Sequence, residues 1–575
     1  MTSPTRDALP GSARTPSPAK PPLSSRMVRA TWRGLPARRH RAGWEPGLVV
    51  PAADGSPLIT DHYFPRAKGD FPTLLVRSPY GRGVPWSPQY GILFAEQGFH
   101  VIVQSCRGTG GSGGRFDLWR NEAPDGLATV SWLREQPWFN GTLGTVGPSY
   151  LGYVQSALAL DPPPELKAMV MQVGLQDPHA LFHTDGVLHL EAALLVGVGM
   201  TYQHRGMAAF GRAAMRLQRR MPAIASARPL RGAFAAALGY EVPWLEEVLA
   251  HPDADDPYWR GAAPGAAVGA EPRPAPTSAP GEAAERSGIP TALITGRYDV
   301  LAGQSFEHYA RLRRAGCDTA LLVGPWTHTS ALQKGWPEVF AESLAWLRAH
   351  LCDDPSGLRP TPVRVHVGGA GAEWRDLDAW PPDPATTSWF PTSDGHLTRQ
   401  PPTDTAPLTS FRHDPADPTP SLGGPLLSRT AGARDNGTLE SRDDVLTFTG
   451  PVLTEPVTVL GPVSARISAS TDTGHGDVFT RLCDVDPRGR STNVCDGLAQ
   501  LRTTAEEPAR VTVPMGDTAH RFGAGHRIRW QISGGAHPRY ACNPGTGEPR
   551  AQATQFVPVR VSIHADSALM LPQEK

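Results

Sequence analysis

The feature that most constrains the fold is a series of short apolar runs separated by segments with a helical pattern. The runs lie at residues 73–76, 100–103, 143–146, 168–173, 292–295 and 320–323. Continuous apolar runs, in contrast to alternating ones, are typical of parallel strands that helices cover on both faces. The sequence therefore predicts an α/β protein built on a parallel sheet.

A long helical stretch interrupts this alternation and divides the predicted core in two. Residues 43–176 and 286–357 carry the pattern of strands and helices, whereas residues 177–285 are rich in Ala, Leu, Met and Arg at helical spacing. We interpret the middle segment as a helical cap inserted into the core. Its end, within 261–288, is rich in Ala, Pro and Gly, a composition that predicts a flexible connection.

The helical signal disappears in the C-terminal part, residues 358–575. Short segments with strand-like composition, such as 361–369, 456–470 and 526–534, follow one another between clusters of turn residues. Many short strands at such spacing indicate a β-sandwich. We expect a C-terminal domain of the all-β jelly-roll type.

The N-terminal 42 residues differ in composition from the rest. They contain nine Lys or Arg, one acidic residue (Asp7) and many Pro and Ser. Such a segment has too little apolar surface to offset the entropy of ordering it, so a disordered basic tail is expected. No apolar stretch follows the pair Arg38–Arg39, which speaks against a secretion signal. Met27 is an alternative start of translation.

Charge and cysteine content limit the classes of ligand. The chain has 55 Lys and Arg against 55 Asp and Glu, so its overall charge does not favour nucleic acid or an anionic membrane, and a small-molecule substrate is expected. No apolar run reaches the roughly 18 residues of a membrane span. The six cysteines form no CxxC pair, so we expect reduced thiols in the cytoplasm, with no metal and no cofactor.

One segment resembles a calcium-binding loop at its start. Asp484, Asp486 and Gly489 have the appropriate spacing, but Arg488 and Cys495 stand where two further ligands would be needed. A hairpin turn is the better interpretation.

Ser149 follows the apolar run 143–146 and precedes a helical pattern. Two interpretations are open. Ser149 could cap the helix, because serine is common at that position. Alternatively it is a nucleophile on a sharp strand-to-helix turn, although Leu151 stands where the usual G-x-S-x-G motif has its last glycine.

Asp299 and His328 follow the two later runs, at 292–295 and 320–323. Loops after the carboxyl ends of parallel strands face one crevice, so these residues and Ser149 are expected to meet there. The order Ser, Asp, His is that of α/β-hydrolases. Taken singly, Asp299 could cap a helix and His328 could be a packed surface residue; together they predict a Ser-His-Asp triad.

A serine nucleophile needs at least two donors for the oxyanion that develops on the substrate. The backbone N–H of Tyr150, next to Ser149, is one candidate. The second should come from the loop after the first run, where the sequence is 78-SPYGRG-83 and contains no series of glycines. We expect the phenol of Tyr80 to act here, with an ordinary half-buried aromatic as the alternative.

Several motifs in this order resemble the cocaine esterase and X-prolyl dipeptidyl-peptidase (CocE/NonD) family of serine hydrolases. They are DGSPLITDHYFP (54–65), RSPYGRG (77–83), RGTGGSGGRF (107–116), PWFNGTLGTVGPSYLG (137–152), HPDADDPYW (251–259), GRYD (296–299), GPWTH (324–328), EWRD (373–376), HDPADPTPSLGG (413–424) and NPGTGEP (543–549). The resemblance implies an α/β-hydrolase core, an inserted cap and a jelly roll. It also implies that G-x-S-Y-x-G is a normal nucleophile turn and that Tyr80 donates to the oxyanion.

Two departures from the family concern the substrate. Ser105-Cys106 stands where relatives have an acidic residue before Arg-Gly, and residues 177–200 of the cap contain no tryptophan. We expect hydrolysis of a small acyl ester, or less readily an amide, through an acyl-enzyme. The alternatives are an X-prolyl dipeptidyl aminopeptidase, an acyltransferase with the same triad, and a jelly-roll binding protein without catalysis.

Overall fold

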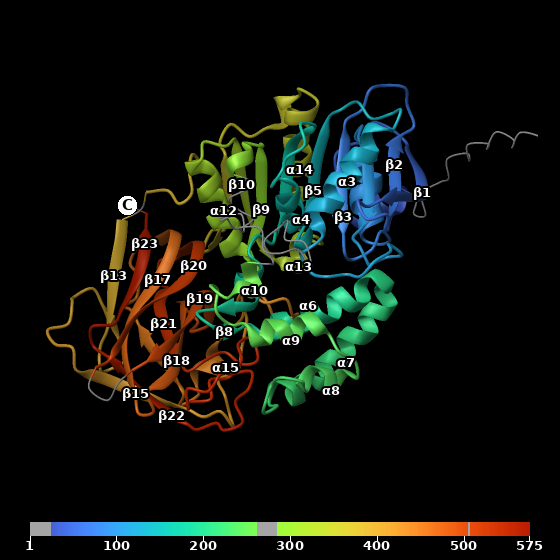
Figure 1. The fold of residues 1–575 in the computed structure, drawn as a ribbon. Coiled ribbons are helices and arrows are strands. Elements are labelled where there is room, and N and C mark those ends of the chain that lie inside the picture. The colour runs from blue at the N-terminus through green and yellow to red at the C-terminus, as the bar shows by residue number, and fades with distance from the viewer. Residues whose placement is uncertain (1–24, 261–284, 384, 504–506, 575) are drawn as a thin grey trace, which may run out of the picture.

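The computed structural model describes residues 25–260, 285–383, 385–503 and 507–574. It contains an α/β core, a helical cap and a C-terminal β-sandwich that lies beside both (Figure 1). The Ala/Pro/Gly-rich connection expected within 261–288 lies largely outside the described residues.

The core is built on one twisted sheet, and the predicted α/β class is confirmed. Strands β4, β3, β5, β6, β9, β10 and β11 run parallel, and β1, β2 and β12 join the edges in antiparallel orientation. In spatial order the strands are β1 (Ala42–Pro51), β2 (Pro57–Pro65), β4 (His100–Ser105), β3 (Thr73–Ser78), β5 (Leu143–Pro148), β6 (Leu166–Gln172), β9 (Thr291–Tyr298), β10 (Thr319–Thr327), β11 (Val363–Gly369) and β12 (Glu373–Leu377).

Both faces of this sheet are buried, which explains the continuous apolar runs. Val76 packs with α2 (Leu93–Ala95) and α14 (Trp336–Leu351) on one face. The preceding residue, Leu75, packs with α3 (Glu122–Arg134) and α12 (Ala302–Arg314) on the other. Because successive side chains of a strand point to opposite faces, both must be apolar when helices cover both.

The cap is a set of helices inserted between β6 and β9. Its buried side chains, among them Leu194, Phe234 and Leu245, form one cluster with Tyr150 and Tyr153 of the core. The cap elements are α5 (Pro178–Phe182), β7 (His183–Thr184), β8 (Val187–Leu188), α6 (Leu190–Tyr202), η2 (Gln203–Arg205), α7 (Met207–Ala225), α8 (Ala233–Leu238), α9 (Pro243–Ala250) and α10 (Pro257–Arg260).

The C-terminal domain consists of two facing antiparallel sheets around an apolar core that includes Trp530 and Phe448. One sheet contains β13 (Ala385–Pro391), β15 (Pro407–His413), β17 (Val457–Thr471), β20 (Ala509–Phe522), β22 (Val559–His564) and β23 (Ala568–Gln573). The other contains β16 (Val445–Thr449), β21 (Arg527–Ser533), β18 (His475–Val485) and β19 (Ser491–Arg502). The predicted all-β jelly roll is confirmed.

The segment 361–369 differs from its expected place in the sandwich. It forms β11, which pairs in parallel with β10 of the core over residues 363–365. Its last two residues, Gly368 and Gly369, pair with β20 of the sandwich. A strand-like composition cannot show which sheet a strand joins, and this strand joins the sheets of both domains.

The expectation of a disordered tail over residues 1–42 is wrong for its second half. Helix α1 (Ser25–Thr31) packs on the core, with Val28 only 4% exposed and Arg29 paired with the buried Glu96 at 2.8 Å. The Trp32 indole N–H donates to the Gln333 carbonyl at 2.8 Å. These few side chains hold the segment in place because the core offers partners for them, such as Glu96 and the Gln333 carbonyl. Amino-acid composition does not reveal such partners. Residues 1–24 lie outside the described residues.

Candidate active site

Ser149 lies at the turn between β5 and α4 (Tyr150–Leu158) in a strained backbone conformation, with φ 57° and ψ −124°. A non-glycine residue in such a conformation persists only when its surroundings fix it. Here the Ser149 N–H donates to the carbonyls of Gln172 and Val173 at 3.0 and 3.1 Å, and its own carbonyl accepts from Gly152 and Leu175. The Ser149 hydroxyl makes no helix-capping hydrogen bond. The N-cap interpretation is therefore wrong, and the hydroxyl is free for another role.

The positions of the glycines around Ser149 follow from close packing. A Cβ atom on Gly152 would lie 2.8 Å from the Gly174 Cα atom, and a Cβ atom on Gly147 would lie 2.6 Å from the Leu151 side chain. Leu151 itself is 1% exposed and packs in the core. The helix thus needs a glycine three residues after Ser149, where it passes the backbone of residue 174, and the apolar Leu151 fits at the position before it.

Asp299 and His328 follow β9 and β10 and contact each other. His328 Nδ1 lies 2.7 Å from Asp299 Oδ1. The second Asp299 oxygen accepts from the Thr295 hydroxyl at 2.9 Å, and Asp299 is 1% exposed. A buried carboxylate in this position fixes the tautomer and the orientation of the imidazole. Sequence reasoning missed Thr295; a hydroxyl residue within the strand, four positions before the acid, is the signal that could have revealed it.

Ser149 and His328 line one small cavity of about 30 Å³. Within the described residues, the two side chains share no hydrogen bond. The core, the cap and the sandwich all contribute to the walls. The lining residues are Tyr80, Trp119, Ser149, Tyr150, Leu175, Leu181, Val196, Met200, Val300, Leu301, His328 and Leu427.

The Tyr80 phenol points at the candidate nucleophile. Its oxygen lies 3.4 Å from Ser149 Oγ, and its ring stacks on Trp86 with 5.4 Å between centroids. Burial raises the pKa of Tyr80 to about 12, although the contacts of its oxygen with the Ser149 hydroxyl and the Tyr150 backbone N–H act in the opposite direction. The phenol is therefore protonated at neutral pH. The phenol oxygen and the Tyr150 backbone N–H approach each other beside Ser149.

A buried polar network supports Tyr150 from behind. The Tyr150 phenol accepts from the Trp119 backbone N–H at 2.8 Å and donates to Glu122 Oε1 at 3.0 Å. Glu122 in turn pairs with Arg77 at 3.1 Å, and both side chains are almost fully buried. Sequence reasoning missed this network because nothing in the spacing of residues 77, 119 and 122 indicates that they meet.

Ser105-Cys106 replaces the acidic residue of the relatives, and Ser105 still holds the loop that contains Arg82. The Ser105 hydroxyl accepts from Arg82 Nη1 at 2.7 Å, and Arg82 Nε also pairs with Asp61 at 3.1 Å. A Cβ atom on Gly110 would lie 2.3 Å from Ser105 Oγ, so the side chain at 105 is closely packed. A short hydroxyl thus holds the guanidinium in this chain.

Within the described ranges, no group of three or more His, Cys, Asp or Glu side chains is arranged to hold a metal ion. No helix in those same ranges is long and apolar enough to cross a membrane.

Comparison with protein families matches two models to the chain. The model of the X-Pro dipeptidyl-peptidase (S15 family) matches residues 54–330, and that of the X-Pro dipeptidyl-peptidase C-terminal non-catalytic domain matches residues 357–569. The chain is 32% identical over 552 residues to the cocaine esterase of Rhodococcus sp. (strain MB1 Bresler), which covers 87% of this chain and 92% of that protein.

Two solved structures share the fold. An aminopeptidase from a marine sediment Thaumarchaeota archaeon superposes with a TM-score of 0.78 at 21% identity, covering 94% of this chain and 98% of that one. An α-amino acid ester hydrolase superposes with a TM-score of 0.76 at 20% identity and the same coverage. At these identities the likeness concerns the fold alone.

Proposed function

Because the chain belongs to the serine hydrolase family of cocaine esterase and the X-Pro dipeptidyl-peptidases, we propose that it hydrolyses esters of small, uncharged carboxylic acids with Ser149 as the nucleophile. The observation that carries this proposal is the strained Ser149, whose hydroxyl lies 3.4 Å from the Tyr80 phenol at the cavity that His328 also lines.

The proposed reaction proceeds in two halves. His328 accepts the Ser149 proton while Oγ attacks the ester carbonyl carbon, and Asp299 stabilises the resulting imidazolium. The carbonyl oxygen becomes an oxyanion that accepts from the Tyr80 phenol and the Tyr150 N–H. Collapse of this intermediate breaks the ester bond, and His328 returns the proton to the leaving alcohol. Water then attacks the acyl-enzyme by the same steps and releases the acid.

The walls of the cavity support an uncharged acyl group. Apart from Ser149, His328 and the two tyrosines, the lining side chains are apolar, and no carboxylate is among them. A substrate ammonium would have no partner there, and burying an unpaired charge is costly. This disfavours the X-prolyl aminopeptidase alternative. Trp119 supplies an aromatic wall although residues 177–200 of the cap contain no tryptophan.

The cavity admits only about one or two water molecules at 30 Å³. Side chains that line it must therefore move when a substrate enters. The acyl groups that need least movement are short, so we expect acetyl and propionyl esters to be preferred over long-chain ones.

The test combines covalent labelling with a substrate panel. A fluorophosphonate probe should label the wild-type protein and the surface control Ser131→Ala, but not Ser149→Ala. Loss of the nucleophile typically reduces turnover on the order of a million-fold. Unlabelled wild-type protein, or a Ser149→Ala variant that keeps a tenth of the activity, would refute the proposal and revive a binding role for the jelly roll.

Chromogenic esters of increasing acyl length, Xaa-Pro anilides, and reactions with added alcohol then define the reaction. Turnover of short neutral esters is expected. Preference for the anilides would indicate a peptidase, and transfer to the added alcohol at the expense of the acid product would indicate an acyltransferase.

The cytoplasm is the proposed location. The six cysteines, all of them free of disulfides, suit a reducing compartment.

A further inference from the structure

A second cavity lies at the junction of the core and the sandwich. Its volume is about 440 Å³, and none of its lining residues lines the cavity at Ser149. The walls come from the ends of β9 and β11, from the turn between β18 and β19, and from β20 and the residues before β21. The lining residues are Arg297, Tyr298, Gly369, Ala370, Ala433, Asp484, Asp486, Pro487, Arg488, Arg490, Thr492, His520 and His526.

The negative charges in this cavity are already engaged. The two oxygens of Asp484 contact His526 Nδ1 at 2.7 Å and His520 Nε2 at 2.9 Å. Asp486 closes the turn by accepting from the backbone N–H groups of residues 488 and 490 at 2.9 and 3.0 Å, and it also pairs with Arg490 at 3.5 Å. Neither carboxylate is therefore available as the partner of a further cation. These contacts also identify the calcium-like segment as a hairpin turn.

Two arginines that line the cavity lack such a partner. Arg297 donates from Nη1 to the Ala519 carbonyl at 2.9 Å, but its Nε is buried without a hydrogen-bond partner in the described structure. The guanidinium is packed in place, because a Cβ atom on Gly368 would lie 2.3 Å from Nη1. Arg488, on the turn, is exposed and forms no ion pair with any described residue.

A buried histidine also lines the cavity. His520 is 5% exposed, and its Nδ1 has no partner within the described residues. Burial lowers the pKa of His520, against the hydrogen bond to Asp484, and the positive charge of Arg297 lowers it further. The positive charge of the cavity therefore comes from Arg297, Arg488 and Arg490, which outnumber the two carboxylates Asp484 and Asp486.

We propose that this cavity binds a small oxyanion, the phosphate or carboxylate class, between Arg297 and Arg488. A guanidinium offers paired N–H donors that match two oxygens of such a group. Arg297 and Arg488 have no carboxylate partner among the described residues, and an oxyanion in the cavity would supply one to both. The site is distinct from the proposed catalytic one, although Arg297 lies on β9, the strand that precedes Asp299.

Calorimetric titration in a chloride buffer at constant ionic strength tests the proposal, with inorganic phosphate and acetate as separate probes. One saturable site per chain is expected for at least one probe, and the ratio of the two affinities distinguishes phosphate from carboxylate. The Ser149→Ala protein should bind equally well, so the result does not depend on the proposed hydrolysis.

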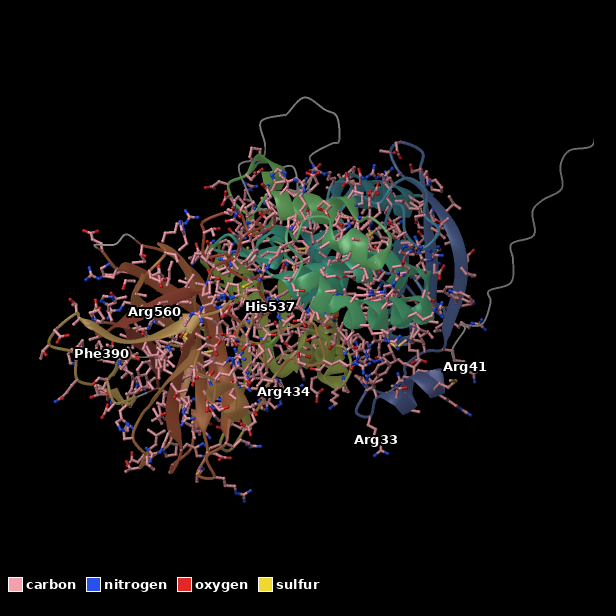
Figure 2. All side chains as sticks on the ribbon, turned by 90° about the horizontal axis from the view of Figure 1, so that it is seen from below. Arg33, Arg41, Phe390, Arg434, His537 and Arg560 are labelled. Carbon is pink, nitrogen blue, oxygen red and sulfur yellow. The ribbon has the colours of Figure 1, made fainter. Side chains whose placement is uncertain are left out.

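Variants locate the site. Arg488→Gln, a change on an exposed turn, should weaken binding about tenfold or more without changing the melting temperature. Arg297→Gln should abolish it, provided that the variant melts within a few degrees of wild type. The control Arg560→Gln, on β22 away from the junction (Figure 2), should bind as wild type does. Absence of saturable binding to wild type, or unchanged affinity in Arg488→Gln, would overturn the proposal.

Discussion

A buried pair of histidines should make the stability of the core depend on pH. His62 on β2 and His100 on β4 are 3% and 9% exposed, and His62 Nε2 lies 2.9 Å from His100 Nδ1. Both rings stack on Trp138, at 4.1 and 4.7 Å between centroids. One nitrogen of the pair must donate and the other accept, so the arrangement suits two neutral rings.

The magnitude follows from the pKa shifts. Burial, with a smaller contribution from His100, lowers the pKa of His62 from 6.5 to about 3. Burial also lowers the pKa of His100 to about 4, against the attraction of Asp70. The folded state therefore binds fewer protons than the unfolded state below pH 6.5, and stability is lost as pH falls through that value. At pH 5 each ring costs about 2 kcal/mol relative to pH 8.

The assay is urea unfolding of wild type and His62→Gln at pH 8 and pH 5. Gln keeps an amide nitrogen near the position of His62 Nε2 but does not titrate. The loss of unfolding free energy between the two pH values should be smaller in His62→Gln by about 2 kcal/mol. His396→Gln, in which a side chain that is 68% exposed is replaced, should behave as wild type. An equal loss in wild type and His62→Gln would mean that His62 is protonated in the folded protein.

Three further predictions concern the active site. Tyr80→Phe removes the phenol that we propose as an oxyanion donor but keeps the ring, so kcat should fall about 10² to 10³-fold with a smaller change in KM; a rate within threefold of wild type would assign the second donor to another group. Gly152→Ala places a Cβ atom against the Gly174 backbone and should lower both kcat and the melting temperature, since no flexible side chain can yield there; unchanged values would show that the helix can shift. Tyr150→Phe breaks the contact with Glu122 behind the proposed oxyanion donor, the Tyr150 N–H. Steady-state kinetics should therefore show a loss in kcat that exceeds any rise in KM, whereas a loss in melting temperature alone would make the network structural.

Some parts of this structure could be predicted because the sequence pattern has only one physical solution. Runs such as 143–146 are apolar at every position because the strand is covered on both faces, and this gave the sheet and the loops that meet at its edge. Asp299 and His328, which contact each other at 2.7 Å, were placed by that topology. Ser149 was less certain, because Leu151 departs from the common motif. The glycine of this motif is needed where α4 passes close to the backbone of residue 174. No local sequence pattern reveals that contact.

Other parts depend on contacts between distant segments. Arg29 is ordered through Glu96, 67 residues away, and composition alone describes the surrounding segment as a tail. Tyr150, Trp119 and Glu122 meet only after the fold has formed. The composition of residues 361–369 indicates a strand but does not specify its neighbours. In the structure this strand pairs with both β10 and β20.

Strand β11 limits how the core and the sandwich can be exchanged between relatives. The two family models meet between residues 330 and 357, as if the chain could be cut there and either part exchanged for that of a relative. Strand β11 belongs to the second part by sequence, yet it completes the sheet of the first through β10 and joins β20 through its last residues. A chimaera divided at this boundary would bring a foreign edge strand to the hydrolase sheet and a foreign wall residue to the position of Leu427. The part of the chain that matches the second family model thus supplies the last two strands of the core sheet, β11 and β12.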